Sequence, residues 1–568
     1  MALRAILYQL IVLALLARGI GGQNASSVQA DLVIVNARIW IGPEKPQNAP
    51  SAQPTAIAVV GDRIHSVGDD ATVRATIGPD TRTIDARGRR VIPGMTDSHT
   101  HIVSGGLQLA RLNLRDVRNR EEFIQSLAAA KDKKTGEWVL GGRWSVESWA
   151  DPKPPSKAWL DPVTGETPTF LERMDGHQAL VNSAALRLAN IDATGPKDPE
   201  GGEIERDPKT GEPTGILKES AADLVSRLIP NPSLSERYQA LRRAMEHANS
   251  LGVTSVHNMS EPDDLEVFRL AHEQKALTIR VTVYLSVSDW PASIEQVKQF
   301  PIRDDFLRVA GFKGYMDGSL GSRTAYMRQP FSDAGPDTRY PRGQLNAMAD
   351  PPESLREMAV KADAMGLQLA VHAIGDEANH LLLDTYEAVG GRSRRKDARH
   401  RVEHVQHLLV EDFARFAKSG VVASMQPYHK ADDGRYAEKA LGHERLKGSY
   451  AFRQLLDAGA LLCFGSDFPV VTLDPFAGID AAVNARTLAG EIWLPSHSLT
   501  LEEALRAYTV SPPKAIHQEN RLGTIEKGKL ADLLILAADP FDMPTERIGE
   551  VRVWQTIVGG KIVYTHPE

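Results

Sequence analysis

The stretch VIPGMTDSHTH, residues 91–101, decides how the rest of the chain is interpreted. It starts as an apolar strand and ends in two histidines that are one residue apart. Alternation along a strand places His99 and His101 on the same face, about 6 to 7 Å apart at their Cα atoms. Two neutral imidazoles on one side can share one cation, because imidazole nitrogen suits zinc and similar ions.

A helix–glycine–strand unit recurs after residue 230. Ser233 and Glu236 have the spacing of a capping box, and apolar residues follow them at helical spacing. Gly252 then ends this predicted helix, and VTSVH at 253–257 has the character of a buried strand. The same order returns at Gly366, Gly420 and Gly459, where glycine suits the left-handed turn that closes a helix.

Eight buried strands can be counted along the chain, with helices between most of them. Parallel strands need helical crossovers, so this alternation predicts a (β/α)8 barrel, an α/β fold of the TIM type. The strands are expected near Met95, Val253, Ile279, Phe312, Leu369, Val402, Val422 and Leu462.

Residues of metal-ligand type end several of these strands. His372 lies in LAVHAIGD, His404 in RVEHVQH and Asp467 in FGSDFP. With His99 and His101 they occupy the ends of strands one, five, six and eight, so all should point into the same opening of a barrel. Asp467 has a second candidate task, since a carboxylate beside a metal-bound water can take its proton.

Both ends of the chain show short alternating strands separated by turns. Neither end has enough strands to bury a core alone, so the two should pair into one small β-sandwich. We expect this sandwich over 30–92 and 520–566, and the barrel over 93–519. The segment of about 106–230 is too long for a single crossover, and it predicts an inserted subdomain that covers the barrel mouth.

Composition and the N-terminus restrict the class of protein. The net charge of −7 argues against nucleic acid as a main partner, and the single cysteine, Cys463, excludes an intramolecular disulfide. Residues 1–22 have the order of a signal peptide, with a basic start, an apolar run and a small polar end. The mature protein is therefore expected to be exported, periplasmic or secreted, without an integral membrane span.

The chain resembles the amidohydrolase superfamily, whose members are metal-dependent hydrolases built on a barrel with a flanking β-sandwich. Within it the chain is most similar to the amidohydrolase-3 family, of the kind typified by N-substituted formamide deformylase. Besides VIPG running into DSHTH, the resemblance rests on RMDGHQALVNSAAL at 173–186, KGYMDGSLGSRTA at 313–325, HAIGD at 372–376, VEHVQ at 402–406, GSDFP at 465–469 and GTIEKGKLADLLIL at 523–536.

The resemblance implies roles for individual residues. It makes His99, His101, His372 and His404 metal ligands, and it makes Asp467 both a ligand and the general base. Strand four of many such enzymes ends in a lysine that CO2 has carboxylated and that bridges two metals, and Lys313 occupies that place. The alternatives are a lysine paired with Asp317 or a site with one metal, and Lys218 is a weaker candidate for the carboxylated residue.

Five polar residues are further candidates for contact with a substrate. Asp175 and His177 lie in the insertion, whereas Asp317, Arg323 and Gln426 follow strands four and seven. Arg323 is of the type that binds a carboxylate. A hydrogen bond that holds a loop is the alternative role for each of the five.

The predicted function is hydrolysis of an amide-type, non-peptide or N-acyl C–N bond by metal-activated hydroxide. Ester, lactone or carbamate hydrolysis on the same site is an alternative, and a non-catalytic, metal-stabilised binding protein of the cell envelope is another. The expected cofactor is a divalent metal, zinc first and manganese or cobalt as alternatives, as one or two ions. The expected partner is a small-molecule substrate, and self-association is left open.

Overall fold

The structure is a computed structural model. It describes residues 28–42, 53–115, 117–130, 138–144, 146, 149, 151, 153–173, 178–199, 202–300, 304–336, 338, 340–349, 352–390 and 397–567. The predicted signal peptide over 1–22 and the candidate residues Asp175 and His177 lie outside the described residues.

Eight parallel strands form one sheet in chain order. The first and last strands meet through the loop after the eighth, where Asp467 N donates to His99 O at 2.7 Å and His101 N donates to Phe468 O at 2.8 Å. The predicted (β/α)8 barrel is therefore confirmed. Its strands are β7 (Met95–Thr100), β14 (Val253–Ser260), β15 (Arg280–Ser286), β16 (Leu307–Tyr315), β17 (Gln368–Ala373), β18 (Arg401–His404), β19 (Val422–Met425) and β20 (Leu461–Phe464).

Helices between the strands bury their apolar faces against the outside of this sheet. The helix α8 shows why: Ser233 and Glu236 form a capping box at its start, and its residues Leu241 and Met245 join the barrel core. Gly252 follows with φ of +83°, a conformation that favours glycine. The helices from residue 234 on are α8 (Leu234–Ser250), α9 (Asp264–Glu273), α10 (Trp290–Gln299), α11 (Pro352–Ala364), α12 (Asp376–Gly390), α13 (Phe413–Ser419), α14 (Pro427–Asp433), α15 (Ala437–Leu441), α16 (Phe452–Asp457), α17 (Pro475–Asn484), α18 (Leu501–Thr509) and α19 (Ser511–Ala515).

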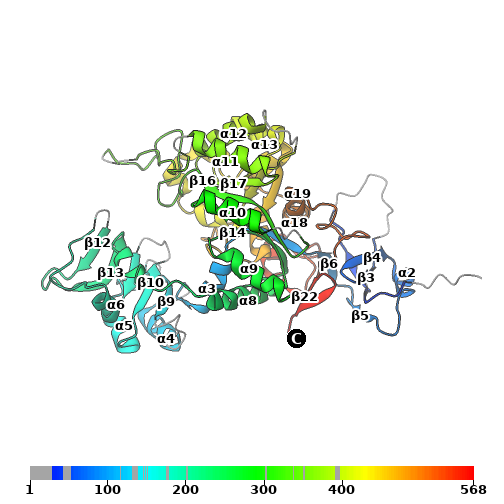
Figure 1. Cartoon of the computed structure of the whole chain (residues 1–568), viewed down its shortest axis with the longest axis horizontal. Coiled ribbons are helices and arrows are strands. Elements are labelled where there is room, and N and C mark those ends of the chain that lie inside the picture. The colour runs from blue at the N-terminus through cyan, green and yellow to red at the C-terminus, as the bar shows by residue number, and fades with distance from the viewer. Residues whose placement is uncertain are drawn as a thin grey trace, which may run out of the picture.

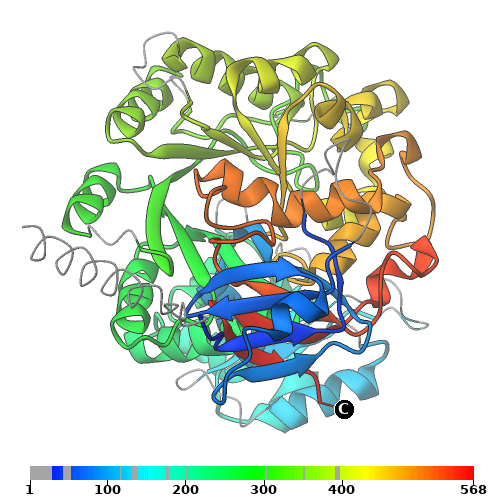
Figure 2. The ribbon, with the colours of Figure 1, turned by 90° about the vertical axis from the view of Figure 1, so that its right-hand side faces the viewer.

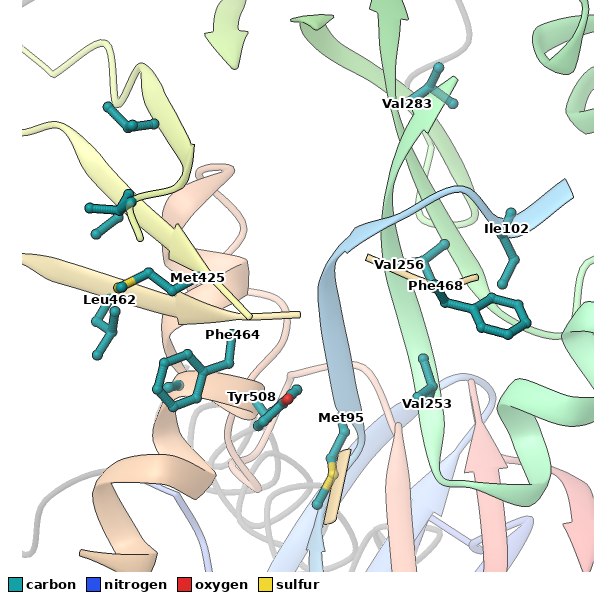
Figure 3. Close-up of a cluster of buried hydrophobic side chains, with 14 of the residues drawn as sticks. Met95, Ile102, Val253, Val256, Val283, Met425, Leu462, Phe464, Phe468 and Tyr508 are labelled. Carbon is teal, nitrogen blue, oxygen red and sulfur yellow. The ribbon is translucent and has the colours of Figure 1, made fainter. Parts of the chain in front are cut away.

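The apolar core continues across the seam where the barrel closes. Figure 3 shows Met95 and Val253 on neighbouring strands, with Phe464 and Tyr508 on the other side of the seam. All four side chains are buried. The loop that carries Asp467 is therefore held on a rigid, packed support.

Both ends of the chain build two small sheets beside the barrel. One has the order β4-β3-β1-β5 and the other β2-β6-β21-β22-β23, and β6 pairs antiparallel with β21 (Figure 2). Ile34 and Ile57 from the first sheet share one apolar cluster with Val91, Leu533 and Ile557 from the second, so the two sheets form a sandwich. The strands are β1 (Leu32–Val35), β2 (Arg38–Ile39), β3 (Ala56–Val60), β4 (Arg63–Gly68), β5 (Arg82–Asp85), β6 (Arg90–Pro93), β21 (Leu533–Leu536), β22 (Val553–Val558) and β23 (Lys561–Thr565), with α2 (Asp70–Arg74) between β4 and β5.

A separate six-stranded sheet lies between β7 and β14 in the chain, with the order β12-β13-β11-β10-β9-β8. It is on the side of the molecule away from the sandwich (Figure 1). Arg143 at the end of β9 donates to the carbonyl of Pro469, so this insertion reaches the loop that carries Asp467. The helix α3 (Ile102–Ala110) follows β7 and joins the barrel core through Ile102 and Val103. The elements of the insertion are β8 (Leu112–Asn113), α4 (Arg120–Ala130), β9 (Val139–Trp144), α5 (Lys157–Thr164), β10 (Thr169–Arg173), β11 (Gln178–Val181), α6 (Ser183–Leu188), β12 (Gly202–Arg206), β13 (Pro213–Glu219) and α7 (Asp223–Ser226).

Among the helices that the structure describes, none combines the length and the apolar character needed to cross a bilayer.

Candidate metal centre

Four histidines and one aspartate meet at the carboxyl ends of the barrel strands. The Oδ1 atom of Asp467 lies 3.4 Å from His99 Nε2 and 3.3 Å from His101 Nε2. The ring of His404 lies 4.8 Å from that of His99 and 4.4 Å from that of His372, measured between centroids. The structure thus brings together the five residues that the sequence places at the ends of strands one, five, six and eight.

The backbone turns sharply where two of these side chains leave their strands. His404 has φ of +74° and Asp467 has φ of +62°, both in the left-handed region that non-glycine residues seldom adopt. Such strain persists only where the surrounding structure enforces it, and it gathers at functional sites. Here the hydrogen bond from Asp467 N to His99 O holds one of the two turns.

The protonation states of these groups suit a cation. Burial and then the nearby Lys313 lower the pKa of His99 to about 4 and that of His372 to about 3, so both rings are neutral at neutral pH. Burial works to raise the pKa of Asp467, whereas the facing His99 and His101 lower it, and the net effect is well below its usual value. Neutral imidazole and ionised carboxylate are the forms that bind zinc and related metals.

Two groups of side chains have donor atoms close enough to hold one ion each. His99, His101 and Asp467 form the first group, and His404, His429 and Asp467 form the second. Within each group the donor atoms lie within 4.8 Å of one another. The residues present therefore fit a divalent metal, with Asp467 common to both groups.

His429 was not among the residues predicted from the sequence. It lies in α14, which begins directly after β19, and its Nε2 atom is 3.9 Å from Asp467 Oδ2. A signal was available, because QPYH at 426–429 follows the end of strand seven at once, but one further histidine among 17 has no distinguishing spacing.

Lys313 lies inside the centre rather than beside Asp317. Its Nζ atom is 3.4 Å from His99 Nε2, and the residue is buried. The Asp317 carboxylate instead accepts the backbone N–H groups of Tyr326, Ile374 and Gly375. Lys218, the weaker candidate, lies on β13 in the insertion and pairs with Glu203 and Glu205.

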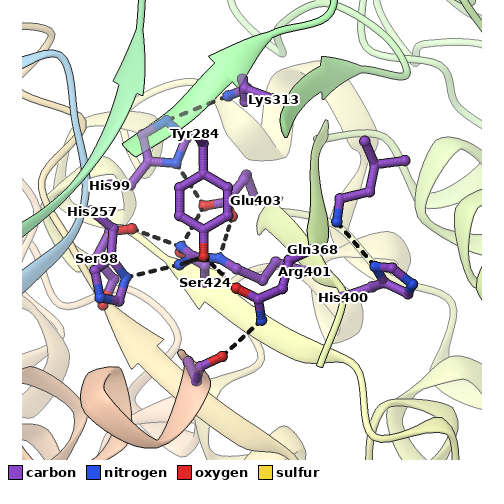
Figure 4. Close-up of polar contacts among 12 residues, drawn as sticks. Ser98, His99, His257, Tyr284, Lys313, Gln368, His400, Arg401, Glu403 and Ser424 are labelled. Atoms are coloured by element: carbon purple, nitrogen blue, oxygen red, sulfur yellow. Dashed lines mark hydrogen bonds and ion pairs between the residues drawn. The ribbon is translucent and has the colours of Figure 1, made fainter. Parts of the chain in front are cut away.

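A buried polar network supports His99 from behind (Figure 4). Glu403 Oε2 is 2.6 Å from His99 Nδ1, and Arg401 Nε donates to Glu403 Oε1 at 2.7 Å. Arg401 also donates to Ser98 O at 2.7 Å. A carboxylate on Nδ1 leaves Nε2 to face a metal, which is the usual arrangement behind a ligating histidine. Neither Glu403 nor Arg401 was predicted as a site residue.

The described candidates for substrate contact make other contacts. Gln426 Oε1 is 2.8 Å from His404 Nδ1, so this amide orients a ligand candidate. Arg323 Nη2 donates to Asp333 Oδ2 at 2.6 Å. The Asp317 carboxylate accepts three backbone N–H groups, and these hydrogen bonds hold the loop after β16 against the loop after β17. In this structure all three residues act as supports for loops or ligands.

Comparison with known proteins places this centre in a family. A family model described as "Amidohydrolase family" matches residues 82–564. The chain belongs to the amidohydrolase family. The protein named N-substituted formamide deformylase of Arthrobacter pascens is 28% identical over 94% of this chain and 98% of its own length. The protein LONG AFTER FAR-RED 3 of Arabidopsis thaliana is 36% identical over 95% of this chain and 92% of its own length.

A solved structure has the same fold as this chain. The crystal structure of an uncharacterized metal-dependent hydrolase from Pyrococcus horikoshii OT3 is 27% identical and superposes with a TM-score of 0.73. The superposition covers 90% of this chain and 99% of that one. The present amidohydrolase is therefore a metal-dependent hydrolase.

Proposed function

We propose that the protein hydrolyses an amide-type C–N bond in a small, non-peptide or N-acyl substrate. The observation that carries this proposal is the position of the Asp467 carboxylate within 3.4 Å of the two imidazoles of His99 and His101. The relative named N-substituted formamide deformylase supports the bond type, since a formamide is itself an amide.

His99, His101, His372, His404 and Asp467 are the residues that would hold the metal. When bound, a divalent cation lowers the pKa of a water molecule and polarises a carbonyl oxygen. The chain supplies the rest of the chemistry. The four imidazoles would fix the position of the reacting groups, and Glu403 keeps the Nε2 atom of His99 directed toward them.

Asp467 is the proposed general base. Its carboxylate takes a proton from the attacking water, a C–O bond forms at the carbonyl carbon, and the C–N bond breaks. Asp467 then returns the proton to the leaving nitrogen, so the products are a carboxylic acid and an amine. The net low pKa of Asp467 keeps it in the ionised form that this role requires.

Lys313 is proposed to carry a carbamate, formed when its amine adds CO2 and releases one proton. Burial lowers the pKa of Lys313 to about 8, which leaves part of the amine neutral and reactive near that pH. Zinc, with manganese or cobalt as alternatives, is the proposed metal. Protein reconstituted with 13C-bicarbonate should show a carbamate carbon by NMR, and the Lys313→Ala variant should lack it.

Export is also proposed, with cleavage of the segment 1–22. The support is the order of a basic start, an apolar run and a small polar end in the sequence. N-terminal sequencing of protein recovered outside the cytoplasm should give a start near residue 22.

The test of the function is a screen of N-formyl, N-acyl and dipeptide-like compounds, read by release of amine. Activity should fall on chelation and return with zinc, manganese or cobalt. Hydrolysis of esters or lactones alone, read by release of acid, would favour the alternative bond types, and absence of turnover in metal-loaded protein would favour a binding protein.

Replacement of Asp467 tests the proposed general base most directly. The Asp467→Asn variant should stay folded and lose amine release by a factor of at least about 100, the usual contribution of a general base. The exposed Asp457→Asn variant is the matched control and should keep normal turnover. Near-normal activity in Asp467→Asn would show that another group accepts the proton.

A further inference from the structure

Three parallel strands of the insertion end beside the loop that follows β20. The strand β9 pairs in parallel with β8 and with β10, so the carboxyl ends of all three strands meet at one edge of their sheet. Figure 1 shows β9 and β10 on the side of this sheet that is nearer to the barrel, with β12 on the far side. Arg143, near the end of β9, donates to the carbonyl of Pro469, two residues after Asp467. This edge therefore lies against the loop that carries the proposed general base.

One face of this edge is rich in arginine. Apolar residues of the three strands point to the other face, into a single buried cluster that contains Leu112, Leu114, Trp144 and Leu171. The residues that alternate with them point away from this cluster. Four of these alternating residues are charged, namely Arg111, Arg115, Arg143 and Glu172. Three guanidinium groups thus face one carboxylate, which leaves two positive charges unbalanced.

These arginines are close enough to affect one another. Burial lowers the pKa of Arg143, and the neighbouring Arg115 lowers it further, whereas Glu172 opposes both effects. Burial also lowers the pKa of Arg111, and Glu172 again acts in the opposite direction. Since arginine stays charged in proteins, the cluster keeps its positive charge in the folded chain. A bound anion would offset the repulsion between these groups.

Much of the hydrogen-bonding capacity of these arginines is unused. In the described part of the chain, the carbonyl of Pro469 is the one hydrogen-bond acceptor of the Arg143 side chain, although a guanidinium has five N–H donors. The Nε atom of Arg111 is buried and has no hydrogen-bond partner among the described residues. Buried charged donors are normally paired, so these two arginines call for an acceptor from outside the chain.

The backbone holds Arg143 at this place at the cost of strain. Gly141, Gly142 and Arg143 have φ of +149°, +128° and +64°. A Cβ atom on Gly141 would lie 2.1 Å from Leu112 O, and one on Gly142 would lie 2.1 Å from Glu172 O, so glycine lets the three strands approach this closely. The left-handed φ of Arg143 is uncommon for a residue with a side chain, and such strain gathers at functional sites.

Resting on the proposed hydrolysis, we propose that the substrate carries a free carboxylate, which Arg111, Arg115 and Arg143 bind at the edge of the barrel mouth. A planar guanidinium binds a carboxylate through two parallel hydrogen bonds, so these residue types suit this group. The positive charge also offsets the repulsion between an anionic substrate and the ionised Asp467. The substrates are then N-acyl amino acids and related acidic amides.

The experiment compares N-acyl amino acids with their C-terminal amides, which have a similar shape without the charge. Zinc-loaded, full-length protein is tested on each matched pair, and the deacylated product is identified by chromatography. In the wild type, kcat/KM should be at least about 10-fold higher for the acids, because the hydrogen bonds that they accept are charge-assisted. This preference should shrink as the salt concentration rises.

Two variants test the arginines separately. Arg111→Gln keeps the hydrogen bond between Arg143 and Pro469, and it should reduce the preference for acids at least about fivefold through a higher KM, with kcat and the rates for the amides unchanged. Arg143→Gln should also reduce the preference for acids, and any displacement of the loop should slow both substrates of a pair equally. Arg187→Gln is the matched control, because Arg187 is an exposed residue on α6 of the same insertion and pairs with Glu166. It should keep the preference of the wild type.

The outcomes separate this inference from the function on which it rests. Equal kcat/KM for acids and amides in the wild type, or an unchanged preference in both Arg111→Gln and Arg143→Gln, would overturn the carboxylate and leave the hydrolysis proposal standing. An equal loss for acids and amides in Arg143→Gln, with normal Arg111→Gln, would make Arg143 a support for the loop and overturn the inference as well. Metal-loaded protein that hydrolyses none of the compounds would overturn the function itself.

Discussion

Glu403 contacts His99 on the side away from the centre, so its replacement separates the orientation of a ligand from the ligand itself. Burial works to raise the pKa of Glu403, but Arg401 and His99 lower it overall, and the carboxylate stays ionised. The Glu403→Gln variant should bind zinc about 10- to 100-fold more weakly, because an amide fixes the His99 tautomer less well. Competition with a chromogenic chelator measures this affinity.

Glu411→Gln is the control for this change. Glu411 is an exposed residue that pairs with Arg328, and its replacement should leave zinc affinity unchanged. Circular dichroism of the metal-free proteins checks that both variants fold. Zinc affinity equal to that of the wild type in Glu403→Gln would mean that His99 is positioned by packing alone.

His407 gives a prediction about acid stability. Burial, with help from Arg445, lowers its pKa to about 3 in the folded protein, against about 6.5 in an unfolded chain. The unfolded state therefore binds a proton first, and stability that is present above pH 6.5 is lost as the pH falls toward 3. This residue contributes up to about 1.4 kcal/mol per pH unit in that window.

Replacement of His407 should make the free energy of unfolding depend less on pH. Urea unfolding of His407→Asn between pH 7 and 4 should show a smaller loss of stability than the wild type, with the difference growing as the pH falls. Parallel profiles for the two proteins would mean that His407 is protonated without cost in the fold.

The predictable part of the metal centre is the part that follows from strand ends. His99, His372 and His404 lie at the carboxyl ends of their strands and Asp467 lies in the loop after β20, so barrel topology is enough to bring them to one opening. His429 comes from a helix after a strand, where the direction of a side chain depends on the turn between them. Glu403 precedes His404 on the same strand, so strand periodicity predicts that the two side chains point to opposite faces. Periodicity alone therefore gives no sign that Glu403 contacts the metal centre.

At the scale of secondary structure, the strands of the barrel could be predicted, whereas the insertion could be predicted as a segment but not in its individual strands. Four of the barrel strands, β14, β17, β19 and β20, are apolar runs that follow a helix-ending glycine, as Gly252 precedes β14. The insertion contains β8, which has two residues, and β9, which holds Gly141 and Gly142 with φ of +149° and +128°. Such strands are defined by their neighbours in space, since β9 pairs in parallel with β10 and β8.

The capping box of α8 provides a prediction at this scale. Ser233 accepts the backbone N–H of Glu236, and the Glu236 side chain accepts that of Ser233. The Ser233→Ala variant should destabilise the first turn by about 1 kcal/mol. Amide hydrogen exchange in that turn should then be about fivefold faster.

Thr500→Ala, which removes the capping box of α18, is the control. It should accelerate exchange at the start of α18 and leave α8 unchanged. Equal exchange rates for α8 in the wild type and in Ser233→Ala would show that packing, not the cap, holds the first turn.

At the scale of the whole molecule, the pairing of the two chain ends could be predicted because neither end can bury a core alone. The register of this pairing could not be predicted, because it depends on a few contacts between the sandwich and the barrel. One of these is buried: Arg280 Nε donates to Asp532 Oδ2 at 2.7 Å, and Arg280 Nη2 donates to Asp532 Oδ1 at 2.8 Å. Arg280 begins the barrel strand β15, whereas Asp532 directly precedes the sandwich strand β21.

This ion pair should be among the strongest single contacts between the two parts. Asp532 Oδ1 also accepts the backbone N–H of Gly559, so the carboxylate joins three segments. The Asp532→Ala variant leaves the Arg280 charge buried and unpaired, and it should lower the free energy of unfolding by about 3 to 5 kcal/mol. Urea unfolding followed by tryptophan fluorescence measures this loss.

The double variant Arg280→Met with Asp532→Ala distinguishes attraction from the penalty of an unpaired charge. Removal of both charges should recover much of the stability that Asp532→Ala loses, because a buried pair replaced by apolar groups is often close to neutral. Breaking the exposed Glu295–Lys298 pair is the control and should change little. If the double variant were as unstable as the single one, the loss would come from the Gly559 contact rather than from the charge of Arg280.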